Sequence, residues 1–308
     1  MKVKKEYLVL AVLIVALSLY LHFRRQDRTQ YELPVLQEVP ASEIMKIEIS
    51  RPKNPPVALE RKGERWVLLP GDYPADPGKV TMLLETLRNL TLSALISESK
   101  SYERYGLGKE DRISVKAWTQ DGLKRGFEVG REAPSFQHTF VTIGGDARVY
   151  HARENLKARF DQSLDDFRDK SVLALALSEL EAVELKDGKT SVRLTRKLDP
   201  PGAPPAQPSW ESAEGAVDDA LVSELLSALS NLKCRAFLYD QTKADFYDSV
   251  YTVTLTGAEE HSLVLFAKDG KNQNDHPALS SQHDSPFLLP DHQAQRIMLP
   301  LEQVVKKP

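Results

Sequence analysis

The feature that most restricts the fold of this chain is a pair of matching amphipathic helices, one in each half of the sequence. Each predicted helix begins after an aspartate, Asp76 or Asp218, whose side chain can accept hydrogen bonds from the free amides of a helix start. Apolar residues then recur at helical spacing, so each helix has one face to bury. The two faces are Val80, Leu83, Leu84, Leu87 and Leu90 in the first helix, and Val222, Leu225, Leu226, Leu229 and Leu232 in the second. This correspondence favours a duplicated unit over two unrelated domains.

The segments on either side of these helices correspond as well. Residues 183–185 repeat the polar and apolar pattern of residues 47–49, and residues 236–238 correspond to residues 94–96. Alternation of polar and apolar residues, interrupted by glycine-containing turns, predicts strands that pair as hairpins. In the first half we expect strands at 44–49, 57–61, 66–69, 113–118, 123–129, 140–143 and 148–151.

The first 30 residues predict a membrane anchor. Residues 7–23 form a mostly apolar run without a charged side chain, which as a helix would be ~26 Å long, enough for a thin hydrocarbon core. Basic residues flank the run, and no small-x-small pattern marks a signal-peptidase site after it. We therefore expect an uncleaved single-pass anchor in the inner (cytoplasmic) membrane, with the C-terminal body in the periplasm or outside the cell.

Together these patterns predict an α+β fold class. An N-terminal single transmembrane helix is followed by two tandem repeats of a mainly antiparallel sheet packed by an amphipathic helix. We expect the anchor at 1–30, the first unit at 31–163, a connector at 164–179 and the second unit at 180–308. The second unit contains a proline-rich insertion at 199–208, which we interpret as a solvated loop, with a peptide-like docking arm as the alternative.

Composition and motifs argue against several classes of function. The chain has 41 basic and 44 acidic residues, and its basic residues are over-represented in the first 30 positions, so the acidic body is a poor partner for nucleic acid. Its single cysteine, Cys234, excludes an internal disulfide and a multi-cysteine metal site. The chain lacks the glycine-rich motifs of nucleotide-binding loops and the G-x-S-x-G motif of hydrolases. We therefore expect no catalytic residues and no cofactor.

One polar segment suggests a different chemistry. Three His-Asp pairs lie between residues 275 and 292, and imidazole and carboxylate groups together can bind zinc or a similar ion. The surrounding asparagine, proline and serine residues are typical of a surface loop. We expect a solvated loop without a bound metal. A metal-dependent enzyme that uses the His276–His292 loop is the less favoured alternative.

Three short motifs, in this order and spacing, resemble a known bacterial family. They are Trp66 followed by Tyr73-Pro74-Ala75-Asp76, then Tyr105-Gly106-Leu107, then Phe167-Arg168-Asp169-Lys170-Ser171-Val172-Leu173. The chain resembles the domain of unknown function 4340 (DUF4340) family of uncharacterised, membrane-anchored envelope proteins, over roughly residues 44–238. The resemblance implies an accessory role, because relatives tend to accompany gliding-motility-type ABC transport components. It carries no catalytic residues over to this chain.

The expected function follows from the anchor, the motifs and the resemblance. We expect a non-catalytic, membrane-anchored periplasmic scaffold or partner-binding subunit, accessory to a gliding-motility-type ABC transporter complex. Its predicted partners are the membrane, through residues 7–23, and the subunits of that transporter. The alternative is a module that binds envelope glycan or another ligand, in which exposed aromatic residues line a groove. The aromatic residues considered for that groove are Tyr102, Tyr105, Phe246 and Tyr247.

Overall fold

The computed structural model describes residues 12–20, 31–188, 190–197, 208–268, 270 and 274–306. The chain divides into two compact units, Met1–Arg168 (unit 1) and Asp169–Pro308 (unit 2), and each is described by itself. The division falls inside the segment 164–179 that the sequence predicted to be a connector. Both units consist of antiparallel sheet with several helices, which confirms the predicted α+β class.

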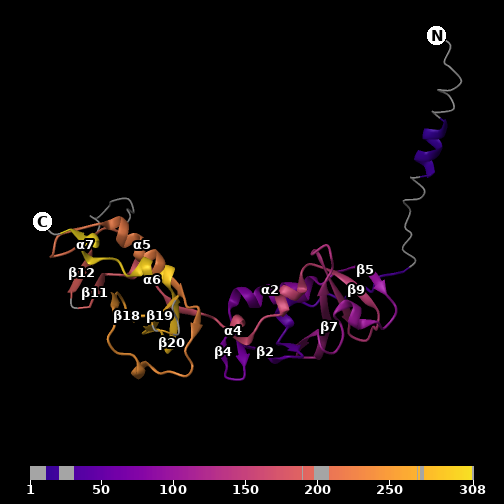
Figure 1. Ribbon diagram of the computed structural model, residues 1–308, viewed down its shortest axis with the longest axis horizontal. Helices are drawn as coiled ribbons and strands as arrows, with labels where there is room; N and C mark the ends of the chain where they lie inside the picture. Colours follow the sequence, from indigo (N-terminus) through magenta and orange to yellow (C-terminus); the bar gives the residue numbers. More distant parts are fainter. Residues whose placement is uncertain are drawn as a thin grey trace, which may run out of the picture. The chain divides into compact units, whose positions relative to one another are not determined.

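Unit 1 is built on a nine-stranded antiparallel sheet with the order β4-β3-β2-β1-β6-β7-β8-β9-β5 (Figure 1). Strands β6 to β9 form a meander, and the edge strand β5 pairs with β9. The elements are η1 (Ala41–Glu43), β1 (Lys46–Arg51), β2 (Asn54–Lys62), β3 (Arg65–Leu69), β4 (Tyr73–Pro74), α2 (Pro77–Asn89), β5 (Leu92–Ser97), η2 (Tyr102–Tyr105), β6 (Ile113–Thr119), β7 (Gly122–Glu132), β8 (His138–Ile143), β9 (Val149–Arg153), α3 (Leu156–Phe160) and α4 (Leu164–Phe167).

Helix α2 supplies the second layer of unit 1. It begins as predicted, because Oδ1 of Asp76 accepts a hydrogen bond from the Lys79 amide at 3.0 Å and Pro77 occupies the first helical turn. The apolar face of α2 packs on the inward-facing residues of the sheet, which alternate along each strand with outward-facing ones. Burial of this face is what holds helix and sheet together.

Unit 2 has an eight-stranded antiparallel sheet, ordered β13-β12-β11-β17-β18-β19-β20-β16, and two further strand pairs, β10 with β15 and β14 with β21 (Figure 1). The elements are β10 (Ser171–Ala174), η3 (Leu177–Glu179), β11 (Ala182–Asp187), β12 (Thr190–Arg196), β13 (Trp210–Glu211), β14 (Ala216–Val217), α5 (Asp219–Leu229), β15 (Asn231–Lys233), β16 (Ala236–Phe237), η4 (Lys243–Asp245), β17 (Tyr251–Thr256), β18 (Glu260–Leu265), β19 (Asp275–Ser280), β20 (His283–Pro290), α6 (Asp291–Ile297), α7 (Leu301–Val304) and β21 (Val305–Lys306).

The main sheets of the two units have corresponding strand orders. We align β11 with β1. On one side of it, β12 and β13 correspond to β2 and β3. On the other side, the series β17, β18, β19, β20 and β16 corresponds to the series β6, β7, β8, β9 and β5. The helix starts correspond in detail. The Asp76 amide donates to the Phe167 carbonyl at 2.8 Å, and the Asp218 amide donates to the Val304 carbonyl at 2.9 Å. Asp218 also caps α5, through the Leu221 amide.

The predicted anchor lies largely outside the described residues. Of the run 7–23, only residues 12–20 are described, and they are helical with exposed apolar side chains. Within the described part of the chain, no helix combines the length and the apolar character needed to cross a membrane. The predicted proline-rich insertion 199–208 also lies outside the described residues, except for Pro208.

The predicted surface loop at 275–292 is wrong. These residues form the β19–β20 hairpin and the start of α6, and most of the hairpin is buried. Proline is rare inside a sheet because it lacks an N–H group, yet Pro277 lies in β19 between two other strands. Its carbonyl accepts a hydrogen bond from the Phe266 amide at 2.9 Å. A residue other than proline at position 277 would donate its own amide to the Phe266 carbonyl. Here Nδ1 of His276 lies 2.9 Å from that carbonyl instead. The histidine thus supplies the donor that proline lacks.

Candidate functional site

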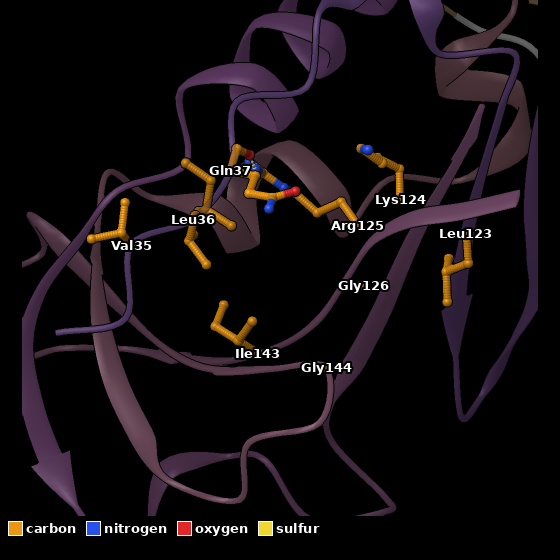
Figure 2. A pocket seen from close by; sticks show the side chains of 10 residues that line it. Val35, Leu36, Gln37, Leu123, Lys124, Arg125, Gly126, Ile143 and Gly144 are labelled. Carbon is orange, nitrogen blue, oxygen red and sulfur yellow. Dashed lines mark hydrogen bonds between the residues drawn. The ribbon is translucent and has the colours of Figure 1, made fainter. Parts of the chain in front are cut away.

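The candidate functional site is a half-open cleft of about 350 Å³ in unit 1 (Figure 2). One wall is a segment that precedes the first strand, residues 31–39, which we call the strap. The other walls are the end of α2, the start of β7 and the end of β8. The residues that line the cleft are 35–37 of the strap, Leu90, 123–126 and 143–144. The cleft therefore lies beside the C-terminal end of α2, next to β7 and β8 of the sheet.

Arg125 is the charged group inside this cleft. It lies on β7 opposite Ala117, so its side chain points toward the core and is only 8 % exposed. Its guanidinium donates hydrogen bonds to the carbonyl of Gln37 in the strap and to the carbonyl of Leu87 in the last turn of α2. A cation at this position complements the negative end of the helix dipole. Burial lowers the pKa of Arg125 from its ordinary value, because the charged form loses solvation.

The walls of the cleft combine apolar and polar groups and are partly open to solvent. Val35 is 94 % exposed on the strap, and Leu123 is 57 % exposed at the start of β7. Leu36 and Ile143 point into the space between these walls (Figure 2), and the exposed amine of Lys124 lies at its rim. Large exposed apolar side chains gathered around a concavity are typical of binding sites. The arrangement suits a ligand with an apolar group and an acceptor or negative charge.

The same corner is built differently in unit 2. There β10 takes the place of the strap, since β10 precedes η3 as the strap precedes η1. The two 3-10 helices are held alike: Nη1 of Arg61 donates to the Ser42 carbonyl, and Nη1 of Arg196 donates to the Ser178 carbonyl, each at 2.8 Å. Unlike the strap, β10 pairs with a neighbouring strand, β15. The strap and β10 thus occupy corresponding positions in the two units, but within the residues described only β10 pairs with a neighbouring strand.

The histidines of the segment 275–292 do not converge. Nε2 of His276 lies 3.2 Å from Oδ1 of Asp291, the ring of His283 stacks on Phe237 with centroids 4.3 Å apart, and His292 is exposed on α6. In the described ranges, no group of three or more His, Cys, Asp or Glu side chains is placed to hold a metal ion. His276 and His283 therefore make contacts within unit 2, whereas His292 is exposed.

The aromatic residues considered for a glycan-binding groove are mostly packed. Tyr105 lies against Phe140, with ring centroids 5.0 Å apart, and the hydroxyl of Tyr102 donates to the Ala147 carbonyl at 3.0 Å. Phe246 lies against another ring of unit 2, and only Tyr247 is largely exposed. The single cysteine, Cys234, is 5 % exposed in the core of unit 2.

Sequence reasoning did not find the cleft. The strap has neither strand alternation nor a helical period, and Arg125 is one of many basic residues in a charged chain. A usable signal exists nevertheless. Ser42-Glu43 is repeated as Ser178-Glu179 just before β1 and β11, the first strands of the two main sheets, and this pair aligns the strap with β10. Aligning the sequences of the strap and β10 by this Ser-Glu pair would have shown that the two units differ at this corner.

Comparison with protein families now gives the family of this chain. A family model, described as a domain of unknown function (DUF4340), matches residues 66–249. This is more than half of the chain, so the match covers most of the folded body. The chain belongs to the DUF4340 family. The match runs across the division between the two units, so the family domain includes parts of both. No curated protein and no solved structure is significantly similar to this DUF4340 member.

Proposed function

We propose that this DUF4340 protein is a membrane-tethered, non-catalytic subunit that binds partner proteins in the cell envelope. In this proposal residues 7–23 form a single transmembrane helix in the inner membrane, and the two units, related by duplication, lie in the periplasm or outside the cell. The complex it serves is a gliding-motility-type ABC transporter, to which it is accessory. Unit 1 contacts the partner through the cleft between the strap and β7.

One observation carries the partner-binding part of this proposal. In the cleft of unit 1, exposed apolar side chains on two different elements, Val35 and Leu123, flank a buried cation, Arg125. Exposed apolar groups that surround a concavity gain free energy when a partner covers them, at about 25 cal/mol per Å² of apolar surface. A charged group at the base adds specificity, because a partner must present an acceptor to it.

The tether is supported by the helix at 12–20. Its large apolar side chains are about half exposed on all sides, and no charged residue interrupts it. A helix that is apolar all round is stable when lipid or protein surrounds it. The basic residues at positions 2, 4 and 5 and at 24 and 25 would then lie at the two membrane surfaces.

The test is photo-crosslinking of the full chain in intact membranes. A photoreactive amino acid replaces Leu123 in one sample and Phe136, an exposed residue outside the cleft, in the matched control. We expect position 123 to capture transporter subunits, position 136 to capture none of them, and the protein to stay in the membrane after alkaline carbonate extraction. Recovery of the protein alone with retained glycan would favour the alternative of a glycan-binding module. Release by carbonate would refute the tether.

A further inference from the structure

We infer that the cleft of unit 1 binds an extended segment of a partner polypeptide, whose main chain bonds to the strap and whose apolar side chain enters between the strap and β7. This inference rests on the proposed partner-binding function and names the form that the partner takes. It comes from comparing the strap of unit 1 with β10 of unit 2. A side chain of unit 2 bonds to β10, and unit 1 has no such side chain at the corresponding position.

In unit 2 that group is the side-chain amide of Gln282. The Ala174 amide donates to Oε1 of Gln282 at 2.8 Å, and Nε2 of Gln282 donates to the Ala174 carbonyl at 3.0 Å. A carboxamide that bonds both polar groups of one residue imitates a peptide group of a neighbouring strand. Gln282 therefore takes the place of a strand beside β10, on the side facing the β19–β20 turn.

In unit 1 the equivalent position has no side chain. The turns correspond, because the Gly144 amide donates to the Gly126 carbonyl at 2.8 Å and the Ser281 amide donates to the Ser262 carbonyl at 2.9 Å. The residue after Ser281 is Gln282, and the residue after Gly144 is Gly145, where an added Cβ would meet no atom within 4 Å. Gly145 thus has no side chain that could bond to the strap as Gln282 bonds to β10.

The strap accordingly keeps its main chain available. Among the described residues, the strap makes no hydrogen bond to other main-chain groups, and the Gln37 carbonyl is bonded by the side chain of Arg125. A segment whose amides and carbonyls have no main-chain partner is a template for the addition of a strand. Arg125 holds the strap in place, so the template is ordered before the partner arrives, which lowers the entropy cost of binding.

The side chains that line the cleft indicate which residue types the bound peptide should contain. Side chains of an added strand alternate in direction, so one of every two would enter between Val35 and Leu123 and would be apolar. The amine of Lys124 at the rim and the guanidinium of Arg125 at the base favour an acidic residue next to it. The expected motif is an apolar residue flanked by an acidic one, without a proline between them, because proline cannot donate to the strap.

The inference is tested by peptide selection on the full chain in detergent micelles. The probe is a phage-displayed library of random linear octapeptides, and the variants are Leu123→Asp and the matched control Phe136→Asp, which adds the same charge at an exposed site outside the cleft. We expect enrichment of the apolar-acidic motif. We also expect an enriched synthetic peptide, followed by fluorescence anisotropy, to bind Leu123→Asp at least about tenfold more weakly, and Phe136→Asp as tightly as the wild type.

Each result decides the inference. A selection without an enriched motif, or an enriched peptide that binds Leu123→Asp as well as the wild type, would overturn it. Both substituted residues are exposed, so we expect the two variants to have matching thermal unfolding midpoints. Matching midpoints would show that weaker peptide binding by Leu123→Asp is not caused by unfolding. The selection needs neither membrane nor transporter. A peptide that binds at the cleft while photo-crosslinking captures no transporter subunit would therefore support this inference and reject the proposed transporter partner.

Discussion

Gln282 and Ala174 are joined by two hydrogen bonds, in which the side-chain amide of Gln282 accepts from the Ala174 amide and donates to its carbonyl. This pair ties β10 to the β19–β20 turn. We expect Gln282→Ala to lower the free energy of unfolding of unit 2 by about 1 kcal/mol, because two partly exposed hydrogen bonds pass to water. Hydrogen exchange of the Ala174 amide should become faster.

The control for this prediction is Gln303→Ala, which shortens an exposed glutamine of α7 in the same unit. Urea denaturation followed by fluorescence gives the free energy of unfolding, and mass spectrometry gives the exchange rate. An unchanged exchange rate at Ala174 in Gln282→Ala would mean that β10 is held by β15 alone.

The two helix caps provide a second prediction. Asp76 caps α2 through the Lys79 amide and Asp218 caps α5 through the Leu221 amide. We expect Asp76→Ala and Asp218→Ala each to cost about 1 kcal/mol of stability in their own unit, since each leaves a helix-start amide without its acceptor. Asparagine at the same positions should restore most of the loss, because its side-chain oxygen also accepts. Unequal losses, measured by hydrogen exchange within each helix, would show that the caps are not equivalent.

These caps belong to the part of the fold that sequence can predict. Asp76-Pro77 predicts the start of α2, and Lys62-Gly63-Glu64 predicts the turn between β2 and β3, where Gly63 has the positive φ of 64° that a tight turn requires. Both signals are local, because the residues that satisfy each other lie within a few positions. The antiparallel meander of β6 to β9 was likewise readable from alternation and turns.

Other features depend on partners that are distant in sequence. Pro277 is typical of a loop, and nothing near it shows that His276 supplies the missing hydrogen bond to Phe266. The cleft depends on Arg125 reaching the carbonyl of Gln37, far away along the chain, and on a glycine standing where the other unit has Gln282. Such compensation is visible only when the sheet brings the segments together. The repeated Ser-Glu pair aligns the two corners in the sequence, but it does not predict the cleft itself.

The role of His276 gives a third prediction. The Phe266 carbonyl accepts, so Nδ1 of His276 must donate to it, and Nε2 faces the carboxylate of Asp291. We expect His276→Ala to lower the free energy of unfolding of unit 2 by about 1 to 3 kcal/mol, because it leaves the Phe266 carbonyl without a donor next to Pro277. The matched control His292→Ala removes an exposed imidazole from α6 and should change stability by less than about 0.5 kcal/mol. Equal urea midpoints for the two variants would contradict this role.

The carboxylate of Asp146 makes the stability of unit 1 depend on pH. The Arg148 side chain donates to it, as does the Tyr150 hydroxyl at 2.6 Å, and these hydrogen bonds, that of Arg148 foremost, hold the pKa of Asp146 well below its usual range. A carboxyl group with a lowered folded-state pKa stabilises the fold above its unfolded-state pKa of about 3.9, and this contribution is lost as the pH falls toward the folded-state value. We therefore expect Asp146→Asn to lower the thermal unfolding midpoint at pH 7, with the gap from wild type shrinking below about pH 4.

Tyr150 gives an independent measure of the same contact. Burial, together with the hydrogen bond to Asp146, raises the pKa of Tyr150 to about 12. The Asp146→Asn variant removes the negative charge that disfavours the phenolate, so absorbance titration at alkaline pH should show one tyrosine that ionises at lower pH than in the wild type. The control Asp121→Asn changes an exposed carboxylate of the β6–β7 turn and should leave both the acid profile and this tyrosine unchanged. A gap between Asp146→Asn and wild type that stays constant from pH 7 to pH 2 would show that the ionised carboxylate contributes nothing to stability at this turn.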